Sequence, residues 1–358
     1  MLGIIFSNIY DAKLKTLTSK RTVASLPFGG RYRLVDFVLS NMINADIKNI
    51  GIITKYNYDS LMHHLGDLGD WDLDVKGSCV RFLPPFSYGS GEVYRGKIEA
   101  LCGAIKFLKK RNEEYVVMSD CINVCNVDLK DVLSSHIESG ADITVVVNDE
   151  NTQKVYDMVI DKKSQYPRIN TRCTYNDVCS IGIFIIKREK LIELVENSAQ
   201  KGFYHFERDI IQKEIICENL TLNLYKFDGT VLRCESESDY LKNNLLVNDE
   251  SVKNSLFINK RPVFTRSGDG VPAKIGSNVC ICSSTVSDGC DICGDVENSV
   301  IFKNVKIETG CQIKNSVILD NVHVGENASI TNAIIDKNTV IEKDTVLCGT
   351  NSHPAIIF

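Results

Sequence analysis

The chain begins with a short apolar run and a polar loop, Gly3-Ile4-Ile5-Phe6 followed by Ser7-Asn8-Ile9-Tyr10-Asp11-Ala12-Lys13. Apolar runs of similar length recur along the first part of the chain, separated by segments with helical spacing of apolar residues. This alternation predicts an α/β domain with a mainly parallel sheet. The ligand crevice of such a sheet lies at the carboxyl ends of its strands, so the loop after Phe6 is expected to line it.

The expected elements follow from this periodicity. Strands are predicted at residues 3–6, 50–53, 115–118, 143–147 and 181–186, and helices at residues 34–45, 96–110 and 129–139. Because Ser119 and Asp120 directly follow the third of these strands, we expect them at the same sheet edge as the loop after Phe6.

A repeat with a period of 17 residues occupies the C-terminal part of the chain. Residues 298–314, 315–331 and 332–348 superpose, and each unit begins with asparagine and has isoleucine three positions later. Such a register stacks identical apolar side chains between successive coils, which predicts a β-solenoid. The sequence thus predicts an α/β domain (1–245), a linker (246–274) and a repeat domain (275–358).

The composition is typical of a globular protein: 358 residues, of which 44% are hydrophobic, with a formal net charge of −5. The acidic balance and the lack of dense basic runs argue against a nucleic-acid partner. No apolar stretch approaches the roughly 20 residues needed to span a bilayer, and the N-terminus does not look like a secretion signal. We therefore expect a cytoplasmic protein that has no membrane partner.

The 14 cysteines are scattered over both halves of the chain. In a large protein without a secretion signal, reduced thiols are expected. Cys280 and Cys282, followed by Cys290 and Cys293, form two close pairs that could be a zinc site. Their spacing matches zinc motifs only loosely, and small side chains alternating along the repeat coils explain them better, so no metal site is predicted.

Several motifs resemble those of a known family. The stretch Phe28-Gly29-Gly30-Arg31-Tyr32-Arg33-Leu34-Val35-Asp36-Phe37, the opening strand, and Tyr94-Arg95-Gly96 ahead of a helix are similar to segments of ADP-glucose pyrophosphorylases, the glucose-1-phosphate adenylyltransferases of glycogen biosynthesis. The resemblance extends from Leu2 to about Thr350. It implies a Rossmann-like nucleotidyltransferase domain followed by a left-handed β-helix of hexapeptide repeats.

The same resemblance points to a loss in the loop after the first strand. The family has a Gly-Gly-x-Gly-x-Arg pattern there, because amides and cations must approach a triphosphate closely. In this chain Asn8, Ile9 and Asp11 replace the glycines, and Lys13 replaces the arginine. A lysine that meets the nucleotide phosphates in the family is Val23 here. These five positions are interpreted as degenerate.

The resemblance also implies an incomplete metal site. Two carboxylates hold the divalent ion in catalytic members. The first corresponds to Asp120, whereas Arg233 stands in place of the second, and a cation there disfavours coordination. We therefore assign no catalytic residue, metal or cofactor to this chain, and expect Mg²⁺ to be required only by a catalytic partner. Asp120 is interpreted as vestigial, and Tyr94, Arg95, Gly96, Ser119 and Asp120 as remnants of the substrate pocket.

Three basic residues match positions at which catalytic members bind a phosphorylated activator or AMP. They are Lys20, Arg21 and Arg33, which we treat as candidates for binding a phosphorylated-sugar or nucleotide effector. The alternative is that they are surface charges without a ligand. Pro27, at another basic position of that site, favours this alternative.

Loss of catalytic positions in a chain that keeps both domains is what the resemblance implies for a regulatory, D-type subunit. Such a subunit is inactive or nearly inactive alone and pairs with a catalytic ADP-glucose pyrophosphorylase subunit, in a heterotetramer, to modulate its activity. Two alternatives remain open. One is a weakly active glucose-1-phosphate adenylyltransferase, and the other is a stand-alone sugar-phosphate sensor.

Overall fold

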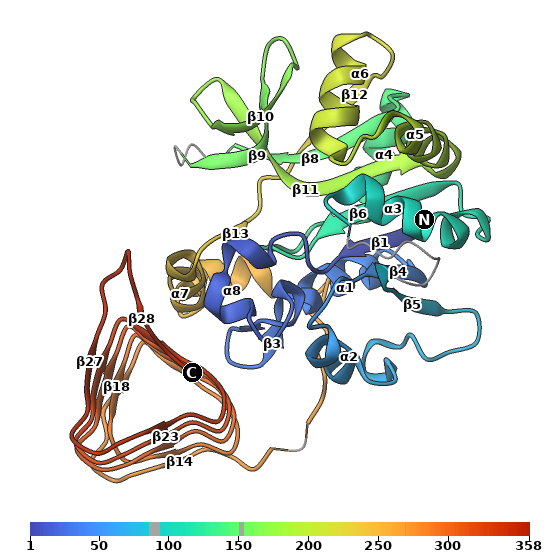
Figure 1. Ribbon diagram of the computed structural model, residues 1–358. Coiled ribbons are helices and arrows are strands. Elements are labelled where there is room, and N and C mark those ends of the chain that lie inside the picture. Colours follow the sequence, from blue (N-terminus) through green and yellow to red (C-terminus); the bar gives the residue numbers. More distant parts are fainter. Residues whose placement is uncertain (86–93, 150–153, 269) are drawn as a thin grey trace.

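The chain folds into an α/β domain and a triangular solenoid that lies beside it (Figure 1). The structure is a computed structural model, and it describes residues 1–85, 94–149, 154–268 and 270–358. None of the described helices is long and apolar enough to cross a membrane.

A mixed sheet of nine strands forms the centre of the α/β domain, with the order β10-β9-β11-β6-β1-β4-β5 and with β8 and β12 attached through β11. Its strands are β1 (Leu2–Phe6), β4 (Asn49–Ile53), β5 (Cys79–Leu83), β6 (Tyr115–Asp120), β8 (Ile143–Asn148), β9 (Val155–Asp161), β10 (Pro167–Arg172), β11 (Asp177–Lys187) and β12 (Leu222–Lys226). Strands β6, β1, β4 and β5 are parallel, whereas β11 runs antiparallel to β6, β8 and β9. The predicted α/β fold and its five predicted strands are confirmed.

Helices cover both faces of this sheet, and each face has its own core. Ile4 and Phe6 of β1 pack with α3 and α5 on one face, while Ile5 between them packs with α1 and α4 on the other. This alternation is the period-2 pattern of a strand buried on both sides. The helices are α1 (Leu34–Asn44), α2 (Asp59–Leu65), α3 (Lys97–Lys109), α4 (Leu129–Ser139), α5 (Arg188–Lys201), α6 (Lys213–Ile216), α7 (Glu237–Leu246) and α8 (Glu250–Leu256).

Shorter elements connect these layers. The helical turns are η1 (Asp11–Lys13), η2 (Lys15–Thr18), η3 (Val23–Ser25), η4 (Gly69–Trp71) and η6 (Phe206–Gln212), and the two-residue strands are β2 (Pro27–Phe28), β3 (Tyr32–Arg33), β7 (Asn123–Val124) and β13 (Leu232–Arg233). Strand β13 pairs with β7, directly after β6, which brings Arg233 to the edge of the sheet where Asp120 lies.

The parallel register places the candidate residues as predicted. Phe6 is the register partner of Asp120, so the loop after β1 and the Ser119-Asp120 pair meet at one sheet edge. Gly182 of β11 lies directly behind this edge with a φ of +72°. A Cβ at that position would collide with the Asp120 carboxylate, so the close packing of β11 against Asp120 depends on glycine.

The solenoid consists of three parallel five-stranded sheets, which form the sides of the triangle in Figure 1. The first sheet holds β14 (Lys274–Ile275), β17 (Asp291–Ile292), β20 (Lys306–Ile307), β23 (His323–Val324) and β26 (Val340–Ile341). The second holds β15 (Ile281–Cys282), β18 (Asp295–Glu297), β21 (Gln312–Lys314), β24 (Ser329–Thr331) and β27 (Val346–Cys348). The third holds β16 (Thr285–Val286), β19 (Val300–Ile301), β22 (Val317–Ile318), β25 (Ala333–Ile335) and β28 (Ala355–Ile357).

The 17-residue repeat explains how the coils stack. Ile301 pairs with Ile318, and Ile318 with Ile335, so equivalent side chains lie above one another in the core. Asn298 and Asn315 turn the corners with φ angles of 42° and 46°, a left-handed conformation that asparagine tolerates. Their side chains form a ladder, with Asn298 Nδ2 donating to Asn315 Oδ1 at 2.8 Å. The predicted β-helix is confirmed.

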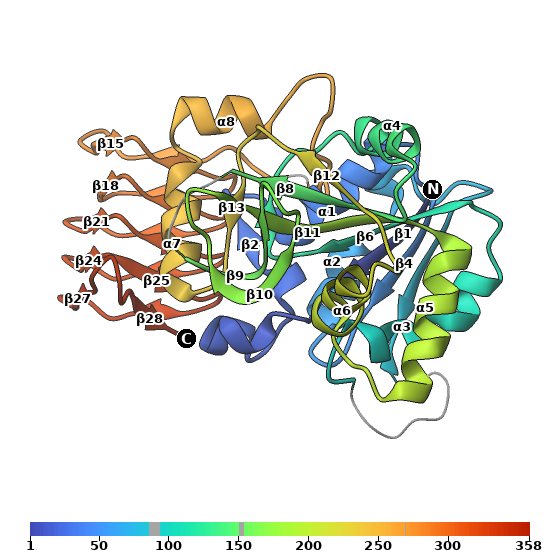
Figure 2. The ribbon, with the colours of Figure 1, turned by 90° about the horizontal axis from the view of Figure 1, so that it is seen from above.

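The two parts share a hydrophobic core. Leu17, Val23 and Phe28, from the segment after β1, pack in one cluster with Val317 and Ile334 of the solenoid's third sheet. Helix α7 lies along the same side of the solenoid (Figure 2). The two parts are therefore joined by buried apolar contact rather than by a linker alone.

A buried ion pair crosses the same boundary. The guanidinium of Arg21 donates to the Asp336 carboxylate of the solenoid at 2.7 Å, and the two side chains are 9% and 6% exposed. Removing one partner of such a pair would leave an uncompensated buried charge. The Arg21 side chain thus forms an ion pair that joins the two parts.

The cysteines differ in one respect from the expectation of reduced thiols. Cys173 and Cys179 form a disulfide that closes the turn between β10 and β11, so the expectation is wrong for this pair. Cys280 and Cys282 lie side by side on the solenoid surface with their Sγ atoms 3.3 Å apart, whereas Cys290 is buried. Among the described residues, no group of three or more histidines, cysteines or carboxylates is arranged to hold a metal ion.

Candidate functional site

The loop after β1 is closed by its own side chains. Asn8 Nδ2 donates to one oxygen of the Asp11 carboxylate at 2.6 Å, and the amide of Val23 donates to the other at 2.8 Å. Asn8 Oδ1 accepts from the amide of Lys55 at 2.9 Å. The amides of Asp11 and Lys13 donate to the carbonyls of Asn8 and Tyr10. The positions predicted to be degenerate thus fold the loop onto itself, and these amides are not available to a phosphate.

Asp11 is the centre of this closed loop and is buried. Desolvation raises its pKa from the ordinary 3.8 to about 6, although the hydrogen bonds from Val23 and Asn8 oppose the rise. A carboxylate here also repels a polyphosphate. Aspartate at position 11, in place of a glycine of the family pattern, therefore changes both the shape and the charge of the loop.

A lysine side chain occupies the position next to Asp120. The Lys97 ammonium donates to Asp120 Oδ2 at 2.8 Å and also contacts the Glu207 carboxylate of η6. The hydroxyl of Tyr10 donates to the same Asp120 oxygen at 3.0 Å. Lys97, Asp120 and Tyr10 are all buried. Asp120 is therefore held by a side-chain cation and a hydroxyl.

The protonation states follow from this geometry. Burial by itself lowers the pKa of Lys97, but the carboxylates of Asp120 and Glu207 raise it above its ordinary value. Burial raises the pKa of Asp120, and the Lys97 ammonium opposes that rise. Lys97 thus stays charged at neutral pH and compensates the carboxylates beside it.

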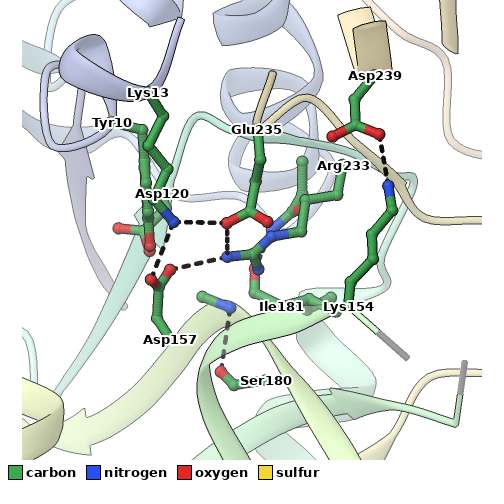
Figure 3. A network of polar contacts seen from close by, with 12 residues as sticks. Tyr10, Lys13, Asp120, Lys154, Asp157, Ser180, Ile181, Arg233, Glu235 and Asp239 are labelled. Atoms are coloured by element: carbon green, nitrogen blue, oxygen red, sulfur yellow. Dashed lines mark hydrogen bonds and ion pairs between the residues drawn. The ribbon is translucent and has the colours of Figure 1, made fainter. Parts of the chain in front are cut away.

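A second ionic network lies next to the first (Figure 3). The Arg233 guanidinium contacts the Asp157 carboxylate at 2.8 Å and the Glu235 carboxylate at 2.7 Å. The Lys13 ammonium bridges the same two carboxylates at 3.1 and 2.6 Å. Burial by itself would raise the pKa of Asp157, but the cations Arg233 and Lys13 lower it to about 2. Two cations and two carboxylates therefore neutralise each other around the side chain of Tyr10.

These residues do not fit a divalent metal ion. Magnesium demands an octahedral set of oxygen ligands, but Asp120 Oδ2 already accepts from Lys97 and Tyr10. The predicted second ligand position is occupied by Arg233, whose guanidinium is tied to Asp157 and Glu235. Internal cations stand where a metal ion would have to bind.

A polar cavity of about 260 Å³ remains in front of the two networks. We call it the Tyr10 cavity, because Tyr10 forms part of its wall. Of the predicted pocket remnants, Arg95 and Gly96 line it. Tyr94 is buried, and the Lys55 ammonium lies 4.8 Å from the centre of its ring. The hydroxyl of Ser119 donates to the Asp120 carbonyl. Tyr94, Ser119 and Asp120 therefore lie behind the cavity wall.

The three effector candidates lie in different environments. Lys20 is exposed, and Arg21 is committed to Asp336. Arg33 lines a cavity of about 450 Å³ between the α/β domain and the solenoid, which we call the interdomain cavity. The Arg33 guanidinium donates to the carbonyl and hydroxyl of Ser60 at 2.6 and 2.9 Å. Cations that were not predicted share this cavity: Arg31, Arg266, Lys303 and Lys337.

Sequence reasoning did not identify the partners that define the closed site. Lys97, Tyr10, Asp157 and Glu207 come from four separate elements, and only their packing reveals that they meet. One signal was present: Lys97-Ile98-Glu99-Ala100 places a lysine just inside the helix that follows Tyr94-Arg95-Gly96. A lysine that is expected to lie near the Asp120 carboxylate is a candidate for an internal counter-charge.

Lys97→Met should destabilise the protein, because the buried Asp120 carboxylate and the partly buried Glu207 carboxylate would be left without their cation. We expect the free energy of unfolding to fall by about 3–5 kcal/mol in urea denaturation. Lys109→Met, on the exposed end of the same helix, is the matched control and should change it by less than about 0.5 kcal/mol. Adding Asp120→Asn to Lys97→Met should recover part of the loss. Equal effects of the two lysine substitutions would contradict this role of Lys97.

The stability should also depend on pH through Asp11. Because the folded-state pKa of about 6 lies above the ordinary 3.8, the folded protein binds this proton more tightly than the unfolded chain does. The contribution of Asp11 to stability therefore falls as the pH rises from about 4 to 6 and is constant above that window. Asp11→Asn removes this titration.

Urea denaturation between pH 4 and 7 measures this effect. The stability of the wild type relative to Asp11→Asn should decline by on the order of 2 kcal/mol as the pH rises through the window. The exposed Asp228→Asn serves as the control. A wild-type advantage that grows with pH would show that the pKa is lowered instead.

Comparisons with known proteins agree with this architecture. Residues 3–223 match the nucleotidyl transferase family, and residues 271–354 match the GlmU-like C-terminal hexapeptide family. The glycogen biosynthesis protein GlgD of Bacillus subtilis (strain 168) is 33% identical over 358 residues, which cover 100% of this chain and 95% of that protein.

Two further relatives are a second GlgD protein and a glucose-1-phosphate adenylyltransferase. GlgD of Geobacillus stearothermophilus is 32% identical over 87% of this chain and 82% of its own length. The glucose-1-phosphate adenylyltransferase of Pseudothermotoga lettingae (strain ATCC BAA-301 / DSM 14385 / NBRC 107922 / TMO) is 30% identical over 86% of this chain and 74% of its own length. With both domains matched, this chain belongs to the glucose-1-phosphate adenylyltransferase (ADP-glucose pyrophosphorylase) family as a homologue of GlgD.

Proposed function

We propose that this chain is a regulatory, catalytically degenerate subunit that modulates a catalytic glucose-1-phosphate adenylyltransferase in glycogen biosynthesis. The catalytic partner would convert ATP and glucose 1-phosphate to ADP-glucose and diphosphate. The observation that carries the proposal is the closed site, in which Lys97 occupies the position beside Asp120 and Arg233 is held by two carboxylates. Two relatives named for glycogen biosynthesis support the pathway.

The chemistry explains why activity of the isolated chain should be absent or very low. Nucleotidyl transfer needs preorganised positive charge on the phosphates, and losing even one such contribution can lower a rate by about 100-fold to 1000-fold. Here the loop amides of Asp11 and Lys13 are occupied, and the cations Lys13 and Arg233 are neutralised by Asp157 and Glu235. Several contributions would therefore be missing together.

The partner would be a catalytic homologue in a hetero-oligomer, for which we propose a heterotetramer in the cytoplasm. A regulatory subunit changes its partner only by binding one of the partner's states more tightly than another. A difference of a few kcal/mol is enough to move a two-state equilibrium from mostly inactive to mostly active. The shared core between the α/β domain and the solenoid would let this chain present both parts as one rigid surface.

The interdomain cavity is the part of this chain that best suits an effector. Arg31, Arg33, Arg266, Lys303 and Lys337 line it, whereas Asp320 is its only acidic lining residue among those described. A phosphorylated sugar or a nucleotide has the charge that such a lining favours. Among the candidates named from the sequence, Arg33 is the one we keep for direct contact, since Arg21 is committed to Asp336 and Lys20 does not line this cavity.

Three matched assays of ADP-glucose formation test the proposal. They use this chain alone, its catalytic homologue alone, and the two co-expressed, at equal concentrations of catalytic subunit and with Mg²⁺ present. We expect no activity of this chain alone, and a changed maximal rate or substrate affinity in the mixture. A mixture of the homologue with an unrelated protein of similar size controls for crowding.

The other outcomes distinguish the alternatives. Robust activity of this chain alone would contradict the closed site and favour a working enzyme. A mixture that forms no complex and behaves as the homologue alone would refute the regulatory subunit and leave a stand-alone sensor as the better hypothesis.

A further inference from the structure

Two exposed thiols lie side by side on the first coil of the solenoid. Cys280 and Cys282 are both exposed, and their Sγ atoms are 3.3 Å apart. Ile281 between them packs against the solenoid core, so the two-residue alternation of a strand directs both cysteines outward. A disulfide requires its sulfurs to approach to about 2.05 Å. A small local shift is therefore enough to join this pair.

Packing of the solenoid does not explain the exposed pair. Cys290 and Cys311 are buried in the solenoid core, where a small apolar side chain is useful. Cys282, in contrast, points outward, and the residues at its register position in the next three coils are Glu297, Lys314 and Thr331. The sheet thus accepts an acidic, a basic and a hydroxyl side chain at this position, and it has no structural need for a thiol there.

The pair is accessible to small molecules. The second sheet, which includes β15, lies on the side of the solenoid that faces away from the α/β domain (Figures 1 and 2). A shallow polar pocket of about 170 Å³ lies directly beside the thiols, and both cysteines line it together with Asp295, Gln312 and Lys314. A compact reagent in this pocket can reach either sulfur atom.

The backbone holds the two cysteines in place but leaves them room to adjust. The amides of Val296 and Asn298 donate to the carbonyls of Cys280 and Cys282 at 2.9 and 3.0 Å. Strand β15 is the first of its sheet and pairs only with β18 among the described strands. Ser283, which follows the pair, has a left-handed φ of 45° at the corner of the coil. The proximity of the sulfurs is thus a property of the fold, and one edge of the strand is free to move.

From this geometry we infer that Cys280 and Cys282 form a reversible dithiol–disulfide site that reacts with low-molecular-weight disulfides. The thiolate of one cysteine attacks the external disulfide, bonds to one half of it and releases the other half, which takes up a proton. The second cysteine loses its proton and displaces the remaining half in the same way. Two protein thiols are oxidised to one disulfide, and one external disulfide is reduced to two thiols.

The exposure of the pair makes this bond reversible. Exposed disulfides belong to the labile class that a pool of small thiols can reduce again. In a reducing compartment, disulfides are usually transient and act in redox sensing or catalysis. The site therefore cycles between two states on the outer face of the solenoid, far from both cavities described above.

Equilibration of the isolated full chain in mixtures of reduced and oxidised glutathione tests the inference. After acid quenching, the free thiols are alkylated, and fragment mass spectra of the tryptic peptide 275–303 report on Cys280 and Cys282 separately. We expect both thiols to be lost together in a single two-electron transition, with no glutathione attached. Excess reduced glutathione should restore both of them.

Cys348 is a control within the same chain. It is exposed and occupies the register position of Cys282 four coils further on, roughly 19 Å away at ~4.8 Å per coil. It should therefore carry glutathione as a mixed disulfide and not join the pair. Cys280→Ser should leave Cys282 with attached glutathione in the same way, whereas Cys348→Ser should leave the transition of the pair unchanged.

Three results would overturn the inference. The pair could stay free under conditions that modify Cys348, Cys280 and Cys282 could each carry their own glutathione, or either could bond to a third cysteine. The experiment uses this chain alone and measures no enzymatic activity. Its outcome is thus separate from that of the regulatory proposal, which the mixed activity assay decides.

Discussion

The need to neutralise the buried Asp120 carboxylate and the partly buried Glu207 carboxylate governs the site. Asp120 ends the central strand β6 and Glu207 lies on η6, and the Lys97 ammonium from the first turn of α3 contacts both. A buried charge is tolerated only when a partner compensates it. In this chain the compensating charge belongs to the protein itself, so three elements are held together without any external ion. The closed loop and the Arg233 network extend the same principle to the rest of the sheet edge.

The short segment between β1 and α1 connects this edge to the solenoid. Asp11 holds the amide of Val23, and the Val23 side chain packs in the core that the two parts share. Ten residues further on, Arg33 lines the interdomain cavity. A rearrangement of this segment would therefore change the contacts around Asp120, in the shared core and in the interdomain cavity. This segment is therefore a continuous physical connection between the sheet edge and the solenoid.

Sequence patterns predicted the repetitive parts of the structure well. The alternation of apolar runs and helical segments gave the elements around β1, β6 and α3, and the asparagine and isoleucine positions gave the solenoid register. Local patterns carry this information because each element buries one face at a fixed period. The antiparallel course of β11, the Cys173–Cys179 bond and the contact between Lys97 and Asp120 join residues through tertiary packing. The sequence indicated which family residues are absent from the site, but it could not indicate which side chains contact one another there.

Electron paramagnetic resonance of Mn²⁺ measures whether internal cations occupy the place of a divalent metal ion. Mn²⁺ is titrated into the isolated chain with and without ATP, and the free-ion signal is followed. We expect the signal of free Mn²⁺ or of Mn²⁺–ATP to be unchanged at protein concentrations of about 0.1 mM, because Lys97 and Tyr10 already hold Asp120. Stoichiometric loss of that signal, abolished by Asp120→Asn, would contradict it.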